Sequence, residues 1–564
     1  MGDMPEFETF TAHDLRWVAE KGFAPIVRRD KRVVSPARDS RIIKAGPARR
    51  VWRFMPEGSD TAVYAKENLL PDLTDRIRYL CRPSKAWSEW QRLEKLKQQS
   101  VPVPRPLAVG VKRRGPLLQT SVIITEEIPG VAPLVEYLCG RAAEASHSEV
   151  SAFTAALAAF IRRLHDAGVV HHDFHPANIM VSGPPEMPAF YLLDVHEVCV
   201  RSAPSRRARL RNLAVLGHFF CRTVPRHWRL RFLAAYLGFG RAPRTEAREV
   251  ERCAESGMRK IWSGRDKRIF SENKYFRHVR IGGLLGHRRV GAMAEAAVRL
   301  FEEGRVFEKP EVTLKDSRSS MVGVFRGEAA GQEVSLLVKR YNARGALKCR
   351  GDLFRLSRGK RGFYFAAAFE LRHLPTPRVY AALDDRRWDR LCSSYVVMEY
   401  IQGAENLAAV LAARESHFHR RLRAEGAAFA ERLARTIRRM HWCGFSMRDL
   451  KAANILVYEE NDRLEHALID LDGVRQYTHA AGRLQAMRNL ARLYFDVSWL
   501  GVPRRLSMHF LKTYLGPVTR AELRIWASGI ARLARAKRRR FTPKGVFGDG
   551  GAATIISMEE RDNG

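Results

Sequence analysis

The chain has 564 residues, 46% hydrophobic and 28% charged, so its composition is that of folded globular protein and its length allows more than one domain. Its 98 Lys and Arg outnumber 61 Asp and Glu, and the formal net charge of +37 favours a polyanionic partner: nucleic acid, an anionic membrane or a phosphorylated substrate. No apolar run reaches the roughly 18 residues of a membrane span, and the cysteines form no C-x-x-C pair. We therefore expect an intracellular protein without a zinc or disulfide framework.

The predicted elements follow the same order in each half of the chain. Alternating or apolar runs predict strands, and amphipathic stretches rich in Ala and Leu predict helices. Strands are predicted at 51–54, 62–65, 122–125, 321–325, 334–338 and 395–398, and helices at 84–98, 150–167 and 424–442. Each half is thus predicted to be a bilobal, protein-kinase-like domain of α+β class, with a small antiparallel β-sheet lobe followed by a larger helical lobe.

An internal repeat relates the two halves. Asp173 and Asn178 recur as Asp449 and Asn454 at a shift of 276 residues, and neighbouring segments recur at shifts between 273 and 278. Matching segments in a constant order indicate two copies of one fold. We therefore expect a first domain at 1–300, with a linker region at 241–300, and a second domain at 301–564. Residues 241–311 have no recognisable counterpart, and their role is left open.

Each copy contains an ordered set of polar residues. A Lys ends a strand, a Glu ends a later strand, and an Asp-x-x-x-x-Asn loop precedes an Asp that follows an apolar strand. In chain order the set is Lys66, Glu89, Glu126, Asp173, Asn178 and Asp194 in the first copy, and Lys339, Glu399, Asp449, Lys451, Asn454 and Asp470 in the second. This order resembles that of protein kinases and related small-molecule kinases.

Phosphoryl transfer requires positioned charges more than covalent help from the protein. The kinase resemblance implies that a copy binds ATP and Mg²⁺ and places a carboxylate at the acceptor hydroxyl. Magnesium favours sparse carboxylate and carbonyl sites that phosphate oxygens complete. The expected roles are nucleotide binding for Lys66, Glu89, Glu126, Lys339, Glu399 and Lys451, magnesium binding for Asn178, Asp194, Asn454 and Asp470, and catalytic proton acceptance for Asp173 and Asp449.

Both copies depart from the protein-kinase pattern. Neither has a Gly-x-Gly-x-x-Gly loop, and neither has the Asp-Phe-Gly or Ala-Pro-Glu sequences of an activation segment, so a peptide platform is poorly supported. At a shift of 273, Glu89 aligns with Gly362, so the second copy lacks the expected ion-pair partner of Lys339. We expect at least one of the two copies to be an active kinase.

Several motifs resemble the lipopolysaccharide kinase family over residues 40–240 and 312–520. They are Ser84-Lys-Ala and Ser357-Arg-Gly before a helix, Pro-x-Pro before a strand, Lys339-Arg-Tyr-Asn, the His-x-Asp and Arg-Asp loops, and Asp470-Leu-Asp. The resemblance implies a fold similar to eukaryotic-like kinases. It also implies ATP-dependent phosphorylation of 3-deoxy-D-manno-octulosonic acid (Kdo) or heptose in the inner core of bacterial lipopolysaccharide.

The resemblance also implies a partner and a location. The expected substrate is an anionic glycolipid, and the basic segments 206–211, 226–231 and 532–540 are candidates for peripheral contact with an anionic membrane. We expect a cytoplasmic protein, peripheral on the cytoplasmic face of the inner membrane, and no nucleic-acid partner, since no recognition motif is found. Two alternatives are a pseudokinase scaffold that binds a membrane or partner, and a protein or small-molecule kinase of other specificity.

Overall fold

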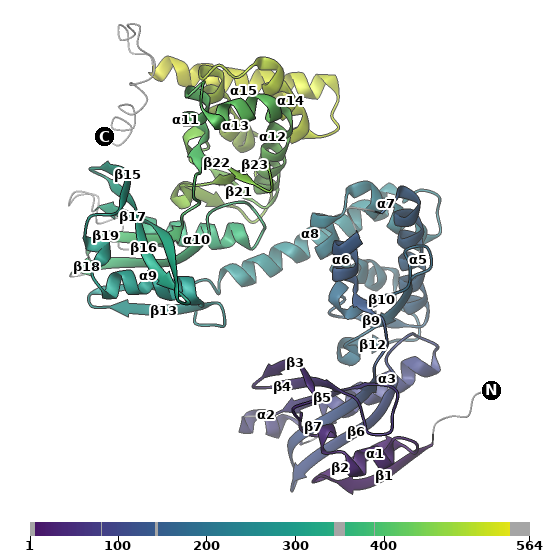
Figure 1. Cartoon of the computed structure of the whole chain (residues 1–564). Helices are drawn as coiled ribbons and strands as arrows, with labels where there is room; N and C mark the ends of the chain where they lie inside the picture. Colours follow the sequence, from purple (N-terminus) through teal and green to yellow (C-terminus); the bar gives the residue numbers. More distant parts are fainter. Residues whose placement is uncertain are drawn as a thin grey trace. The chain divides into compact units, whose positions relative to one another are not determined.

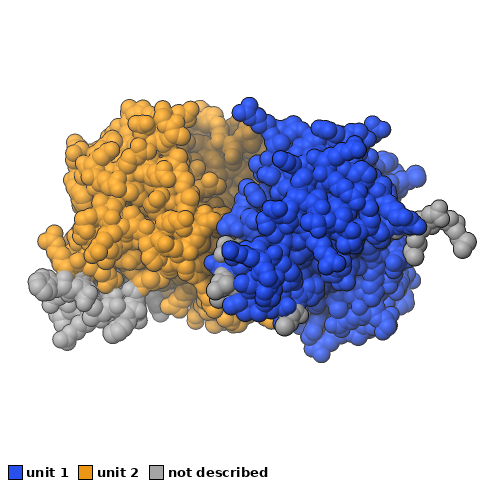
Figure 2. Space-filling model, turned by 90° about the horizontal axis from the view of Figure 1, so that it is seen from below, with its two compact units in different colours: residues 1–258 blue, residues 259–564 orange. Residues whose placement is uncertain are grey.

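The chain divides into two units, Met1–Met258 and Arg259–Gly564 (Figure 2). The computed structural model describes residues 6–70, 72–80, 82–141, 145–342, 356–387 and 390–541. The boundary between the units falls inside helix α8 (Arg244–Asp266), which is earlier in the chain than the expected seam at residue 300.

Unit 1 begins with a seven-stranded antiparallel sheet in the order β1-β2-β6-β7-β5-β4-β3 (Figure 1). The strands are β1 (Phe7–Ala12), β2 (Leu15–Glu20), β3 (Arg41–Gly46), β4 (Arg49–Phe54), β5 (Val63–Leu69), β6 (Pro106–Arg114) and β7 (Leu117–Glu126). Trp17 and Trp52 are fully buried in the core of this lobe. Trp17 lies so close to Gly110 that a Cβ there would come within 2.8 Å of the indole, so this contact requires glycine.

Helix α3 (Lys85–Gln98) connects the sheet to the functional residues. It begins where the Ser84 hydroxyl accepts the Trp87 N–H at 3.1 Å, which satisfies one of the free amides of the first turn. The residues on its buried face recur every three or four positions, as expected for an amphipathic helix, and they are Ala86, Glu89, Trp90, Leu93 and Leu96. This face lies against β6 and β7 and also contacts the 3₁₀ turn η3 (Val195–Glu197). The lobe also contains α1 (Ala24–Arg29), η1 (Lys31–Val33) and α2 (Leu73–Arg78).

The second lobe of unit 1 is mostly helical. Its helices are α4 (Leu134–Arg141), α5 (His147–Asp166), α6 (Arg206–Thr223), α7 (Arg226–Leu237) and the first part of α8. The lobe also contains two small sheets, β8-β10-β11 and β9-β12. Their strands, with the 3₁₀ turn η2 that precedes β10, are β8 (Ala132–Pro133), β9 (Val169–His171), η2 (Pro176–Asn178), β10 (Ile179–Ser182), β11 (Ala189–Leu192) and β12 (Val198–Val200). Buried apolar residues of α3, α5, α6 and α7 form one continuous core with these strands, so α3 belongs to the packing of both lobes.

Unit 2 repeats this plan, with a seven-stranded antiparallel sheet in the order β13-β14-β18-β19-β17-β16-β15 (Figure 1). The sheet lobe contains β13 (Phe276–Ile281), β14 (Leu284–Arg289), α9 (Ala292–Glu302), η4 (Arg305–Phe307), β15 (Val312–Ser317), β16 (Ser320–Ala329), β17 (Gln332–Asn342), α10 (Arg358–Glu370), β18 (Val379–Arg387) and β19 (Arg390–Glu399). Helix α10 is capped by Ser357 in the way that Ser84 caps α3, since the Ser357 hydroxyl accepts the Lys360 N–H at 3.1 Å.

The helical lobe of unit 2 also follows the first. It contains β20 (Glu405–Asn406), α11 (Leu407–Ala412), α12 (His417–Trp442), β21 (Phe445–Met447), η6 (Ala452–Asn454), β22 (Ile455–Glu460), β23 (Arg463–Leu468), η7 (Leu471–Gly473), β24 (Val474–Gln476), α13 (Arg483–Trp499), α14 (Arg504–Leu515) and α15 (Arg520–Phe541). The expected basic segment 532–540 lies in α15, but its side chains from 537 onward are outside the described part. No helix within the described ranges is both long and apolar enough to cross a membrane.

The fold class expected from the sequence is confirmed in both units. The structure also accounts for most of the segment 241–311 that had no recognisable counterpart. Within it, β13 and β14 form a hairpin that pairs with β18, as the hairpin of β1 and β2 pairs with β6. The repeat was not visible here because exposed polar residues alternate along the outer strands of both hairpins. These two strands also share little sequence.

A buried hydrogen-bonded histidine supports the loop that follows α5 and α12. In unit 2, His441 Nδ1 accepts from the Tyr514 hydroxyl at 2.8 Å, and Nε2 donates to Asn489 Oδ1 at 2.9 Å. In unit 1, His165 makes the same contacts with Tyr236 at 2.7 Å and with Asn212 at 3.1 Å. Each ring is therefore held in one neutral form that donates through Nε2.

Acid should destabilise unit 2 through His441. Burial lowers the pKa of His441 to about 4, although its bond to Asn489 opposes the shift. The unfolded chain therefore takes up a proton near pH 6.5 that the folded unit resists, so this stability is complete above pH 6.5 and falls until the pH reaches about 4. The full loss from this residue is roughly 3 kcal/mol.

Urea denaturation of the full chain at pH 7 and pH 5 measures this effect. We expect His441→Gln to reduce the pH-dependent loss of stability relative to the unaltered chain. An equal pH dependence in His441→Gln and in the unaltered chain would show that His441 does not titrate as described.

Candidate functional site

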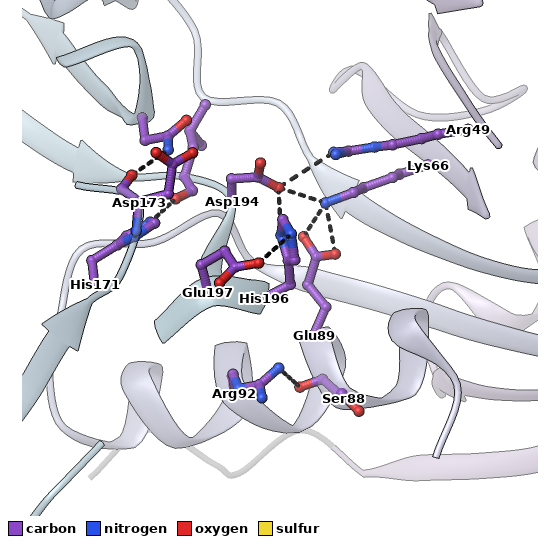
Figure 3. Close-up of polar contacts among 12 residues, drawn as sticks. Arg49, Lys66, Ser88, Glu89, Arg92, His171, Asp173, Asp194, His196 and Glu197 are labelled. Carbon is purple, nitrogen blue, oxygen red and sulfur yellow. Dashed lines mark hydrogen bonds and ion pairs between the residues drawn. The ribbon is translucent and has the colours of Figure 1, made fainter. Parts of the chain in front are cut away.

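Lys66, Glu89 and Asp194 of unit 1 meet where the sheet lobe faces the helical lobe (Figure 3). Lys66 lies on β5, and its Nζ contacts Glu89 of α3 at 2.7 Å and Asp194 Oδ1 at 2.8 Å. The Lys66 side chain is only 12% exposed and that of Glu89 only 8%. A buried ammonium between two carboxylates is a fixed positive charge, because neither lobe can move away without leaving a charge unpaired.

Three side chains donate to a single oxygen of Asp194. Its Oδ1 accepts from Lys66, from His196 Nδ1 at 2.9 Å and from Arg49 Nη2 at 3.3 Å, and the residue has a left-handed backbone with φ of 54°. Burial raises the pKa of the Asp194 carboxyl, but the His196 bond and the Lys66 charge hold it well below its usual range. Asp194 is therefore ionised, and its Oδ2 has no partner within the described residues.

Asp173 and Asn178 lie on one loop that is closed by short hydrogen bonds. Asn178 Nδ2 donates to the Asp173 carbonyl at 2.9 Å, and the Asp173 N–H donates to His171 Nδ1 at 3.2 Å. His171 Nε2 in turn faces the Leu193 carbonyl at 3.3 Å, which ties the loop to the residue before Asp194. The Asp173 carboxylate is exposed and has no ion-pair partner among the residues that the structure describes.

The donor set of unit 1 fits Mg²⁺ bound together with a nucleotide. Asp194 Oδ2 and the Asn178 side-chain oxygen are both left without a hydrogen bond in the described structure, because each group uses its other atom internally. Among the described residues, no three His, Cys, Asp or Glu side chains converge as a metal site by themselves. Two oxygen ligands suit a magnesium ion that phosphate and water oxygens complete.

Unit 2 assembles part of the same set. Lys339 Nζ contacts Asp470 Oδ1 at 2.6 Å, and Asn454 Nδ2 donates to the Asp449 carbonyl at 2.8 Å. Burial raises the pKa of Asp470, but Lys339 outweighs it and lowers the value to about 2. Gly362 is the fifth residue after the Ser357 cap, as Glu89 is the fifth after Ser84, so the two helices align as the sequence predicted. Lys339 therefore has no glutamate from α10 at the position of Glu89.

A different ion pair links α10 to the helical lobe in unit 2. Arg358 Nε donates to Asp472 Oδ2 at 2.5 Å, and the Arg358 guanidinium lies over the Tyr341 ring at 4.5 Å. Burial, followed by the charge of Asp470, raises the pKa of Asp472 above its usual value. Asp472 corresponds to His196 of unit 1, so the carboxylate missing from α10 is replaced by one on η7.

The carboxylates of Asp173 and Asp449 differ in their surroundings. Both oxygens of Asp449 are bound by guanidinium groups, with Arg448 Nη2 on Oδ2 at 3.0 Å and Arg492 Nη1 on Oδ1 at 3.1 Å. At a shift of 277, Arg492 corresponds to Val215, and Arg448 precedes Asp449 as His172 precedes Asp173. An acceptor hydroxyl would therefore compete with these arginines for the Asp449 carboxylate.

The remaining expected residues lie at the edges of the two sites. Glu126 ends β7 and Glu399 ends β19, and their N–H groups donate to the Arg105 and Arg378 carbonyls at 2.9 and 2.8 Å. Lys451 lies between Asp449 and Asn454 and precedes η6. Among the residues that the structure describes, no hydrogen bond or ion pair joins these three side chains to Lys66 or Lys339, and their role in nucleotide binding stays a prediction.

Sequence reasoning missed four contributors to the two sites. Arg49 and Arg492 reach Asp194 and Asp449 only through tertiary contacts across 145 and 43 residues. Arg358 and Asp472 stood inside motifs that were recognised, namely Ser357-Arg-Gly and Asp470-Leu-Asp. Their opposite charges, at positions where unit 1 has Lys85 and His196, were the signal that could have revealed the pair.

Comparison with known proteins supports a lipopolysaccharide kinase relationship. The chain is 28% identical over 143 residues to a 3-deoxy-D-manno-octulosonic acid kinase of Actinobacillus succinogenes, which covers 25% of this chain and 56% of that protein. It is 28% identical over 137 residues to the lipopolysaccharide core heptose(I) kinase WaaP of Escherichia coli, covering 23% and 51%. The corresponding Pseudomonas aeruginosa protein is 28% identical over 207 residues, covering 36% and 72%.

The matches span about half the length of the first two relatives. A solved structure described as WaaP in complex with acyl carrier protein is 22% identical, with a TM-score of 0.32, covering 46% of this chain and all of that one. The model of the lipopolysaccharide kinase (Kdo/WaaP) family matches residues 38–236 and 353–514, which is more than half of the chain and includes segments of both units. The chain belongs to the lipopolysaccharide kinase (Kdo/WaaP) family.

Proposed function

We propose that the protein is an ATP-dependent phosphotransferase that acts on a sugar hydroxyl of the lipopolysaccharide inner core, Kdo or heptose, and that unit 1 performs the transfer. The observation that supports this assignment is the Lys66 ammonium held between Glu89 and Asp194, beside a loop that carries Asn178 and an unpaired Asp173 carboxylate. Such a group of charges stabilises a transferring phosphoryl group without reorganising during the reaction.

Each residue of unit 1 has one task in this proposal. Lys66 binds the nucleotide phosphates, and Glu89 and Asp194 hold its ammonium in place. Asn178 and Asp194 hold Mg²⁺, which neutralises the charge of the phosphate oxygens. Asp173 orients the acceptor hydroxyl and receives its proton, since its carboxylate is exposed and free of ion pairs among the described residues. The γ-phosphoryl group passes from ATP to the acceptor oxygen as that proton leaves, its bond to the β-phosphate oxygen breaks, and ADP is the leaving group.

The acceptor is proposed from the family and the names of the relatives. These name both Kdo and heptose as sugars, so the choice between them is the part of the proposal to be tested first. The net charge of +37 favours an anionic glycolipid and peripheral contact with an anionic membrane, and the cytoplasmic face of the inner membrane is the proposed location. Two of the expected membrane-facing arginines, Arg206 and Arg226, already pair with Glu246 and Glu251, so other cations have to provide most of that contact.

Unit 2 is proposed to support unit 1 without transferring phosphate itself. Gly362 leaves Lys339 without a glutamate from α10, and both oxygens of Asp449 are bound by arginines. This is the pseudokinase alternative applied to one half of the chain. Lys339 and Asp470 still form their ion pair, so a nucleotide could bind unit 2 without being used.

The two aspartates provide a matched test of this assignment. We expect Asp173→Asn to lower phosphate transfer from Mg·ATP to a soluble Kdo- or heptose-containing core saccharide by about 10²- to 10⁴-fold, the usual effect of a positioned general base. Asp449→Asn, in the same full chain, should retain nearly full activity. Transfer of ³²P to each saccharide, with mass spectrometry of the product, gives the rate and the acceptor together.

Loss of activity in Asp449→Asn with normal activity in Asp173→Asn would reverse the roles of the units. No transfer to either saccharide by the unaltered chain, together with unchanged core phosphate in cells that lack the protein, would rule out the proposed reaction.

Glu89 should matter for transfer because it orients Lys66. We expect Glu89→Gln to lower kcat/KM for ATP by about 10- to 100-fold, the loss of one charge-assisted hydrogen bond. Glu94→Gln on the same helix is the control, because Glu94 is half-buried, next to the buried face that carries Glu89, but does not contact Lys66. Equal kinetics for the two variants would show that the Lys66 ion pair has no role in catalysis.

A further inference from the structure

A small cavity lies beside the candidate site of unit 1, between the first turns of α3 and η3. Its volume is about 270 Å³, and its lining includes Arg82, Lys85, Ser88, Arg92 and His196. Figure 3 shows Ser88, Glu89 and Arg92 on the same helix, with His196 beside Asp194. The cavity therefore adjoins the ion pairs of Lys66 but is formed by other side chains. It is smaller than the roughly 300–1,000 Å³ of sites for drug-sized ligands.

The lining is cationic and lacks a counter-charge. No acidic residue is among the described residues that line the cavity. Arg82 and Lys85 have no hydrogen bond or ion pair within the described part of the chain. Arg92 contacts the Ser88 carbonyl at 3.5 Å, and His196 faces Asp194 through Nδ1 and Glu197 through Nε2, at 2.9 and 3.4 Å. Positive charges that line one cavity repel one another unless an anion lies among them.

Unit 2 shows how the same place is occupied when the chain supplies the anion. Counting from the helix caps, Lys85 corresponds to Arg358, and Arg92 to Phe365. Asp472 stands where unit 1 has His196, and it binds Arg358 at 2.5 Å, while Phe365 is 9% exposed. A carboxylate and an aromatic ring thus replace a histidine and an arginine, so unit 2 has an internal ion pair at the position of the cationic cavity.

We infer that the cavity of unit 1 binds an oxyanion from outside the chain, a phosphate or phosphate monoester. Guanidinium and ammonium groups on one helix face, near the positive end of a helix of 14 residues, suit a compact, strongly charged anion. The anion would link α3 to η3 as Arg358 and Asp472 link α10 to η7. Because Glu89 lies on α3 and His196 contacts Asp194, the bound anion would also steady the ion pairs of Lys66.

Calorimetric titration of the full chain with inorganic phosphate tests this inference. We expect Lys85→Ala/Arg92→Ala to weaken phosphate binding at least about tenfold, since charge-assisted hydrogen bonds are lost. Lys95→Ala, an exposed lysine on the same helix, should bind like the unaltered chain. His196→Asp, which recreates the arrangement of unit 2 beside Lys85, should also weaken phosphate binding and removes no cation from the helix.

The Lys66→Met variant separates phosphate binding at the cavity from phosphate binding at the nucleotide site. Phosphate binding by this variant should persist. Binding that is lost in Lys66→Met but retained in Lys85→Ala/Arg92→Ala would overturn the inference and leave the proposed function intact. Absence of phosphate binding by the unaltered chain would also overturn it. Binding at the cavity in a chain without phosphotransfer would uphold the inference alone.

A parallel titration with a soluble phosphorylated core saccharide distinguishes the sources of the anion. Tighter binding of the saccharide than of inorganic phosphate, with the excess lost in Lys85→Ala/Arg92→Ala, would identify the glycolipid as the source. Equal affinities would identify free phosphate as the ligand.

Discussion

One lysine–aspartate ion pair in each unit sets the relation between the sheet lobe and the helical lobe. Lys66 reaches Asp194 across 128 residues of sequence, and Lys339 reaches Asp470 across 131. A buried ammonium and a carboxylate are costly to remove from water and become more costly if either loses its partner. The strand, the loop and the helix beside them must therefore be built so that these charges stay in contact, and the other polar groups of the site are arranged around them.

The two units balance this buried charge in different ways. In unit 1, Glu89 on α3 and Asp194 both contact Lys66, and His196 contacts Asp194. In unit 2 the helix carries Gly362 and Arg358, and Asp472 supplies the second carboxylate. The changes are complementary. Unit 2 lacks the helix glutamate but gains Asp472 on η7, so the total charge near the lysine is similar in the two units. Unit 2 thus retains the fold, whereas the free Asp173 carboxylate and the cationic cavity are features of unit 1.

Local features of the sequence were sufficient to predict much of this structure. The cap residues Ser84 and Ser357, the constant spacing of Asp173 from Asn178, and the aspartates after apolar strands all depend on short-range chemistry. The outer hairpins β1–β2 and β13–β14 were missed because their pairing depends on distant strands and their exposed faces are polar. Arg49 and Arg492 were missed for a related reason, since only the folded chain brings them to their carboxylates.

The most direct test of the central ion pair is to ask which lysine contacts a nucleotide. An acyl-phosphate derivative of ATP transfers its acyl group to an amine that lies against the phosphates, and peptide mass spectrometry identifies the modified residue. Modification of Lys66 that is prevented by ATP with Mg²⁺ is the expected result. Modification that spares Lys66, or that ATP does not prevent, would contradict the assignment of this charge to nucleotide binding.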